Sequence, residues 1–215
     1  MKHAAYHNAA GKRLPSVTTI INRFKDSGGL IRWASQCGLD GVDIDAVKQD
    51  AATAGTIAHD MVEADLRGTV WAQSGPVDTD VLLKAKAGFS AFLTWKKGAA
   101  LDYKYSEVPL VSEEFQFGGR LDAIGAFDNQ LCLIDWKTSN AVYQDHLIQM
   151  AAYKALWEEN YPDRPITGGF HLCRFSKEHG DFAHHYYPDL SEAWEAFRHM
   201  RRLYDLTAAL KKRAS

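Results

Sequence analysis

The sequence of 215 residues lacks the features that mark secreted, membrane-bound or iron–sulfur proteins. It has only three cysteines, Cys37, Cys132 and Cys173, which are far apart and form no C-x-x-C pair. They supply neither an even set of disulfides nor the four thiolates of an iron–sulfur cluster. No stretch approaches the roughly 18 apolar residues of a membrane helix, and the first residues lack the apolar core of a signal peptide. We therefore expect a cytoplasmic protein with free thiols, no iron–sulfur cluster and no membrane partner.

An excess of basic residues and a nucleotide-binding loop are also missing. The chain has 25 Lys and Arg against 27 Asp and Glu, a formal net charge of −2, so an overall basic nucleic-acid coat is excluded. Any nucleic-acid site must be a local patch. No G-x-x-x-x-G-K-[ST] motif occurs, so a nucleotide-driven motor would have to be a separate protein.

The pattern of apolar residues predicts one domain over 1–215, with helices and strands in separate parts. A mainly helical part occupies 1–100, a sheet-containing core 101–188 and a basic helix 189–215. Within these parts the periodicity predicts helices that start at Ser16, over GLIRWASQ, and at 46–66, 78–97, 144–160 and 189–212. It predicts strands at 103–111, within 113–137, and in GFHLCRF and DFAHHYY.

A predicted hairpin brings two acids together. Asp128 and Asn129 stand between two apolar runs, and both residue types tolerate the left-handed backbone of a two-residue turn. That turn places Asp122 opposite Asp135, where side chains of directly opposed residues have Cβ atoms about 5 Å apart. Lys137, two residues beyond Asp135, points to the same face. Like charges at this distance repel each other unless a cation neutralises them.

The chemistry of this pair favours a hard divalent cation. One Mg²⁺ or Mn²⁺ would suit two carboxylates, with the peptide carbonyl of Trp136 as a further ligand. The alternative is an ordinary surface salt bridge between Lys137 and an aspartate. The strand around Asp135 reads as buried, however, and burying carboxylates without partners costs several kcal/mol.

Four motifs in order along the chain resemble those of the RecB-like branch of the PD-(D/E)xK nucleases. They are Gly55-Thr56-Ile57-Ala58-His59 (G-x-x-x-H), Gly119-Arg120-Leu121-Asp122 (G-x-x-D), Asp135-Trp136-Lys137 (D-x-K) and Gln149 with Tyr153 (Q-x-x-x-Y). The segment PSVTTII and the tract 33–63 further resemble the exonuclease group that includes the mitochondrial genome maintenance exonuclease and related phage enzymes.

The resemblance implies an α/β fold with a restriction-endonuclease-like core. A central mixed sheet would be flanked by helices, and an N-terminal helical elaboration would form one wall of the cleft. The implied catalytic residues are Asp122, Asp135, Lys137 and His59, and the implied metal ligands are Asp122, Asp135, the Trp136 carbonyl and His59. DNA contacts are expected from Gln149, Tyr153, Gly119, Arg120, Thr138, Ser139, Ser16 and Thr18.

The function expected from these motifs is that of a metal-dependent DNA exonuclease. It would hydrolyse phosphodiester bonds from single-stranded or frayed ends, with one or two Mg²⁺ or Mn²⁺ ions and no nucleotide, in DNA repair, recombination or phage DNA metabolism. The setting would be a bacterial or phage-infected cell, with a separate recombination, single-strand-binding or helicase protein as a candidate partner. A structure-specific endonuclease of the same fold and a catalytically silent DNA-binding subunit are the alternatives.

Two further groups of residues remain open. His171, His179, His184, His185 and Cys173 invite a zinc site, but they do not form short repeated pairs, so a solvent-facing hairpin is preferred. The basic residues near the C-terminus indicate either a DNA patch or a solvated helix face. Glu63, Glu107, Glu113 and Glu114 are acidic neighbours that stay outside the predicted catalytic set.

Overall fold

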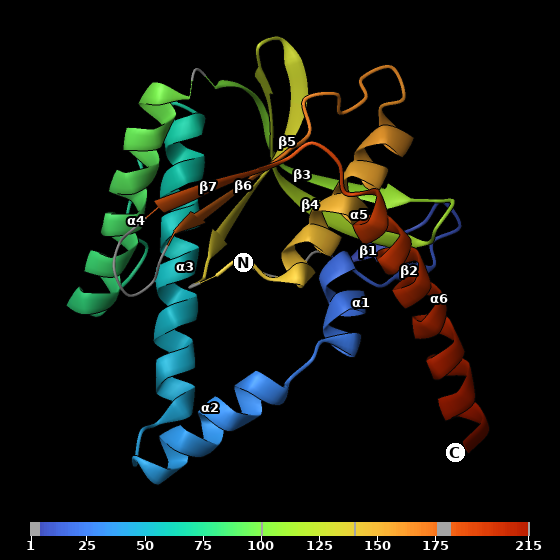
Figure 1. The fold of residues 1–215 in the computed structure, drawn as a ribbon, viewed down its shortest axis with the longest axis horizontal. Helices are drawn as coiled ribbons and strands as arrows, with labels where there is room; N and C mark the ends of the chain where they lie inside the picture. Colours follow the sequence, from blue (N-terminus) through green and yellow to red (C-terminus); the bar gives the residue numbers. More distant parts are fainter. Residues whose placement is uncertain (1–4, 100, 140, 176–181, 215) are drawn as a thin grey trace.

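A five-stranded sheet between two layers of helices forms the centre of the fold (Figure 1). The computed structural model describes residues 5–99, 101–139, 141–175 and 182–214. Its elements are β1 (Tyr6–His7), β2 (Arg13–Leu14), α1 (Val17–Phe24), α2 (Gly28–Leu39), α3 (Ile44–Leu66), α4 (Thr79–Gly98), β3 (Asp102–Ser112), β4 (Phe117–Phe127), β5 (Gln130–Thr138), α5 (Gln144–Asn160), β6 (Phe170–Phe175), β7 (Phe182–Tyr187) and α6 (Ser191–Ala214).

The sheet is mixed, with the strand order β3-β4-β5-β6-β7. Strand β4 pairs antiparallel with both β3 and β5, and β6 pairs antiparallel with β7. Strands β5 and β6 are parallel, and α5 makes the crossover between them. A parallel pair needs such a long connection, because a tight turn can join only antiparallel strands. The α/β architecture with a mixed sheet and flanking helices is confirmed.

The turn between β4 and β5 has the predicted form and sets the predicted register. Asp128 and Asn129 both have left-handed backbones, with φ of 48° and 62°. Phe127 pairs with Gln130, and the ladder continues in step to Ala123 and Ile134. Beyond that pair the backbone ladder ends, so the two strands separate just before Asp122 and Asp135.

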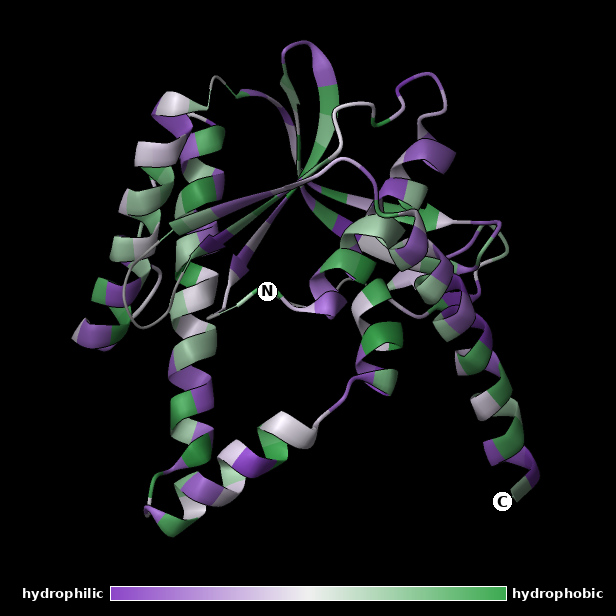
Figure 2. Ribbon diagram, viewed as in Figure 1, coloured by the Kyte–Doolittle hydropathy of each residue, from purple (hydrophilic) through white to green (hydrophobic). Residues whose placement is uncertain are grey.

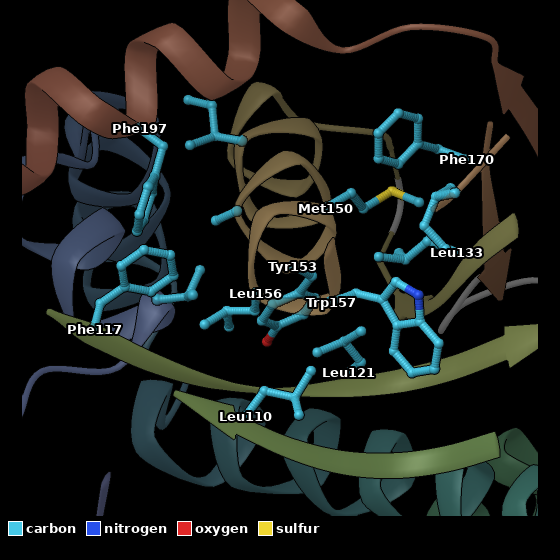
Figure 3. Close-up of a cluster of buried hydrophobic side chains, with 14 of the residues drawn as sticks. Leu110, Phe117, Leu121, Leu133, Met150, Tyr153, Leu156, Trp157, Phe170 and Phe197 are labelled. Carbon is cyan, nitrogen blue, oxygen red and sulfur yellow. The ribbon is translucent and has the colours of Figure 1, made fainter. Parts of the chain in front are cut away.

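Two hydrophobic clusters cover the two faces of the sheet. Helices α1, α5 and α6 pack on one face, where Figure 3 shows Met150, Tyr153, Leu156 and Trp157 of α5 against side chains of the strands. Helices α3 and α4 cover the other face, where Phe92 and Trp136 meet edge to face at 5.2 Å. Figure 2 shows the hydrophobic residues along the middle of the sheet. Burial on both faces explains the nearly continuous apolar sequence of β5.

The predicted helices are present, and their starts follow from polar caps. The Asp43 side chain accepts hydrogen bonds from the amides of Asp45 and Ala46, which begins α3 two residues earlier than predicted. Asp78 caps α4 in the same way. Among the described residues, no helix is both long enough and apolar enough to cross a membrane.

The N-terminal hairpin and strand β6 differ from expectation. Strands β1 and β2 form a short antiparallel pair that the sequence did not reveal, and Ser16 just after it bridges to Gly118 of β4. The solvent-facing hairpin expected around His171 is wrong for β6, because His171 is only 7% exposed and Cys173 is fully buried. Parallel pairing with β5 draws this strand into the sheet. His179 lies outside the described residues.

Candidate active site

The four residues predicted to be catalytic lie close together where β4 and β5 separate. Asp135 is fully buried, and Lys137 Nζ lies 2.6 Å from its Oδ2 atom. Asp122 approaches from β4, and its Oδ2 atom accepts a hydrogen bond from the Trp136 amide at 2.9 Å. His59 comes from α3 and interacts electrostatically with both Asp135 and Lys137. Helix α3 and the β4–β5 hairpin thus assemble one polar cluster, which we call the acidic cluster (His59, Asp122, Asp135 and Lys137).

Asp135 is the most unusual member of the acidic cluster. Neither of its oxygens meets the geometric criteria for a hydrogen bond, and its close neighbour is the ion-paired Lys137 ammonium. Burial, with a smaller contribution from the charge of Asp122, raises the pKa of Asp135 to about 7, although Lys137 acts in the opposite direction. Burying a carboxylate whose oxygens form no hydrogen bond costs folding free energy, so its presence calls for an explanation such as a functional role.

The neighbours of Asp135 have shifted pKa values for related reasons. Burial raises the pKa of Asp122, while Lys137 and the Trp136 amide lower it. The two carboxylates raise the pKa of Lys137 more than burial lowers it, so the lysine stays charged. Burial and then Lys137 lower the pKa of His59 to about 4, and the ring donates a hydrogen bond to the Trp136 backbone. His59 is therefore a neutral ring at pH 7.

Gly55 explains how α3 reaches the strand that carries Asp135. A Cβ atom at this position would lie 2.5 Å from Thr138 Oγ1, closer than real contacts allow. Only glycine therefore lets the helix pack this closely on the end of β5. Because His59 lies one turn further along α3, this contact also fixes the distance between His59 and Asp135.

Gln149, Tyr153 and Gly119 form a second layer beside the acidic cluster. Gln149 Nε2 donates to the Tyr153 hydroxyl at 2.7 Å, and Tyr153 is 5% exposed. A Cβ on Gly119 would lie 2.7 Å from Tyr153 Cε1, so the glycine makes room for the ring. Burial raises the pKa of Tyr153 well above its usual value, and Asp122 and Asp135 raise it further. The tyrosine thus stays protonated and packs next to both carboxylates.

Glu107 joins the site although sequence reasoning left it aside. Its Oε2 atom lies 3.2 Å from Arg120 Nη1, and its charge raises the pKa of Asp122. Burial raises the pKa of Glu107 itself. Its backbone is left-handed, with φ of 51°, which is uncommon for a residue inside a strand. No sequence pattern indicates such a conformation, so the proximity of Glu107 to Asp122 could not be predicted.

Comparison with protein families identifies the superfamily of the chain. The family model described as the PD-(D/E)XK nuclease superfamily matches residues 30–213. The chain belongs to the PD-(D/E)XK nuclease superfamily. No curated protein matches it in sequence.

Solved structures similar to this PD-(D/E)XK chain include two with exonuclease names. A proposed exonuclease from Eubacterium rectale has a TM-score of 0.48 and 13% identity over 73% of this chain and 68% of its own. LHK-Exo, solved in complex with dAMP, has a TM-score of 0.41 and 13% identity over 76% of this chain and 91% of its own.

Several predicted DNA-binding hydroxyls of this PD-(D/E)XK chain are engaged within the protein. The Ser16 side chain caps α1 by accepting from the Thr19 amide at 3.0 Å and also contacts the Thr18 hydroxyl. Ser139 Oγ donates to the Ala141 carbonyl at 2.8 Å. The Thr138 hydroxyl faces Gly55 of α3. Their contact with DNA remains a prediction.

The donor set of the acidic cluster suits a hard cation. Among the residues that the structure describes, no three His, Cys, Asp or Glu side chains form a ready metal-binding group. The Asp135 oxygens nevertheless form no hydrogen bond, although Lys137 is ion-paired with one of them, and Asp122 is bonded to the amide of the adjacent Trp136. Carboxylate and carbonyl oxygens are the ligands that Mg²⁺ and Mn²⁺ prefer. Glu63, one turn beyond His59, is instead paired with Arg67 at 2.6 Å.

Proposed function

We propose that the chain is a metal-dependent deoxyribonuclease whose reaction centre is the acidic cluster. The observation that carries this proposal is Asp135, a fully buried carboxylate with two unsatisfied oxygens, beside a second carboxylate and a lysine. Membership of a nuclease superfamily supplies the reaction class. A structural salt bridge would need neither the second aspartate nor the unsatisfied oxygens.

Each residue of the cluster has a distinct proposed role. Asp122, Asp135 and the Trp136 carbonyl would hold Mg²⁺ or Mn²⁺, and such an ion would supply Lewis-acid stabilisation of the phosphodiester and of its leaving oxygen. Lys137 would orient or activate the attacking water. His59 would serve as a further ligand or approach the scissile phosphate, and its lowered pKa leaves its ring neutral at pH 7. Gln149 and Tyr153 would brace Lys137 or position the DNA backbone.

Single-stranded or frayed DNA ends are the proposed substrate. Helix α2 spans the distance between α1 and α3 (Figure 1), and none of its residues is buried. It exposes apolar side chains, including Ile31 and Trp33, at 66% and 38%. Exposed aromatic groups can stack on unpaired bases. This bridging helix, which leads into the helix that carries His59, supports an arch over a single strand.

The test is cleavage of three substrates under three metal conditions. End-labelled linear single strands, linear duplex and covalently closed circles would be incubated with Mg²⁺, with Mn²⁺ and with a chelator. We expect metal-dependent loss of linear single strands, with circles spared. Cut circles would replace the exonuclease by the endonuclease alternative. DNA that is bound but never cut, under any condition, would favour the silent binding subunit.

A further inference from the structure

A basic groove runs between α1, the β1–β2 hairpin and the C-terminal half of α6, away from the acidic cluster. Two adjoining pockets of about 360 and 490 Å³ form it, and Tyr204 lines both. Figure 1 shows α1, the hairpin and α6 side by side. We define the basic groove by its positively charged lining residues, which are Lys12, Arg13, Arg23, Arg201, Lys211 and Lys212.

The charge of the basic groove contrasts with that of the whole chain. Six of its lining residues are cationic and only Asp205 is acidic, whereas the chain has a formal net charge of −2. Asp205 is itself paired with Arg201, at 2.7 Å. Such segregation of positive charge creates a local field that attracts polyanions although the protein as a whole is acidic.

The groove is held in place by buried contacts. Arg201 is 8% exposed, and its Nε atom donates to the carbonyls of Phe115 and Gln116, both at 3.1 Å. This arginine ties α6 to the segment that enters β4. Leu14 of the hairpin and Val17 of α1 are both buried and anchor these two elements in the protein. The exposed cations therefore stand on a fixed scaffold.

The basic groove also adjoins the strand that leads to the acidic cluster. Ser16, which lines the groove, bridges to Gly118 of β4, four residues before Asp122. Tyr6 lines the groove and packs on Gly118 so closely that a Cβ there would overlap its ring. Tyr6 also interacts electrostatically with Arg120 and Glu107. Tyr6 thus connects the groove to Arg120 and its ion-paired partner Glu107, whose charge also acts on Asp122.

We propose that the basic groove binds the phosphate backbone of the DNA strand beyond the acidic cluster. The proposal rests on the proposed function, since that function supplies a strand that starts at Asp122 and Asp135. Charge complementarity selects the occupant, because a row of cations on a fixed scaffold matches a regularly spaced polyanion and contacts it without sequence preference. The site would add affinity for long strands without touching the reacting atoms.

The test compares two triple variants with the same change in net charge. Arg13→Gln, Arg23→Gln and Lys211→Gln neutralise three exposed groove cations, and Lys84→Gln, Lys86→Gln and Lys97→Gln neutralise three exposed cations of α4. Both are made on an Asp135→Asn background, and the affinity for a labelled single strand of about 30 nucleotides is measured over a range of salt concentrations. Three lost phosphate contacts should weaken binding about tenfold or more and reduce the log–log salt slope by about 2.

Cleavage of short substrates separates this proposal from the proposed function. With Asp135 restored, the groove variant should cut an oligonucleotide of about 6 nucleotides at the wild-type rate, because such a strand reaches only the acidic cluster. Equal DNA affinities of the groove variant and the α4 control would overturn the proposal. So would a competition experiment in which polyglutamate displaces the long strand equally well from both triple variants. If DNA binding depends on the groove but the wild type cleaves no DNA, the proposed function is wrong and the groove proposal stands.

Discussion

Two groups of polar residues lie in the same sheet, and each contains a buried member, Asp135 in one and His171 in the other. The acidic cluster surrounds Asp135 on β5, and a histidine pair joins β6 to β7. His171 Nδ1 lies 2.8 Å from His184 Nε2, and the two rings stack at 5.0 Å with an angle of 7°. Phe127 stacks on His171 at 4.3 Å, and Trp95 lies 5.2 Å from His184.

The difference between the two groups is charge. Burial and then the neighbouring His184 lower the pKa of His171 to about 4, so the His171 ring is neutral at pH 7 and packs among aromatic side chains. Asp135 has a pKa of about 7 and a charged lysine beside it, so it keeps a partly ionised carboxylate in the interior. Burial of a polar residue therefore does not mark a site by itself. The proposed reaction centre rests instead on a buried charge with unsatisfied oxygens.

The largest expected effect is on DNA cleavage, which should depend on the acidic cluster and not on the histidine pair. Asp135→Asn and Lys137→Ala should each reduce cleavage by about a thousandfold or more, because each removes a group that would act at the reacting phosphate. His171→Phe should keep cleavage within a few-fold of the wild type. Rates on linear DNA with Mn²⁺ measure all three.

Thermal unfolding provides the control for these variants. Mn²⁺ should raise the unfolding temperature of the wild type and of His171→Phe, because a ligand that binds only the folded state stabilises it. The same ion should leave Asp135→Asn unchanged. Wild-type cleavage rates in folded Asp135→Asn and Lys137→Ala would refute the assignment of the acidic cluster.

A smaller effect is expected from the approach of α3. Gly55→Ala would place a Cβ 2.5 Å from Thr138 Oγ1, so α3 must move outward and carry His59 with it. A displacement of this kind should lower kcat by about 10- to 100-fold, since catalytic geometry tolerates little change. Gly38→Ala in α2 is the matched control, because its Cβ meets nothing within 4 Å. Equal rates for the two alanine variants would show that the close contact has no catalytic consequence.

The sequence predicted these regions unequally, for physical reasons. The β4–β5 register was accessible because Asp128 and Asn129 fix it locally, and alternation then places Lys137. Helix starts followed from caps such as Asp43. The left-handed backbone of Glu107 was not accessible, because tertiary packing imposes it.

The N-terminal hairpin and the burial of strand β6 could not be predicted from the sequence for a related reason. The hairpin strands have only two residues each, too short for a periodic pattern, and their packing depends on the distant Gly118. The alternation in β6 resembles that of a surface strand, but its parallel partner β5 buries it. Such outcomes depend on contacts between residues far apart in the chain.

The smallest expected effect distinguishes the two polar groups by the sign of their pH dependence. His171 has a pKa of about 4 in the folded protein, against an ordinary value of 6.5, so the unfolded chain binds more protons between these values. Its contribution to stability is present above pH 6.5 and is lost as the pH falls toward 4. Asp135 has its folded pKa raised from 3.8 to about 7, so its contribution is lost as the pH rises through this range.

Urea unfolding in chelator at pH 7.5 and at pH 5.0 measures both signs. On acidification, His171→Phe should lose less stability than the wild type, by about 2 kcal/mol, because 1.36 kcal/mol accompanies each pH unit below the unfolded pKa. Asp135→Asn should lose more than the wild type, since it lacks the carboxylate that gains stability at low pH. A change of the same sign in both variants would mean that the acidic cluster and the histidine pair respond to burial alike.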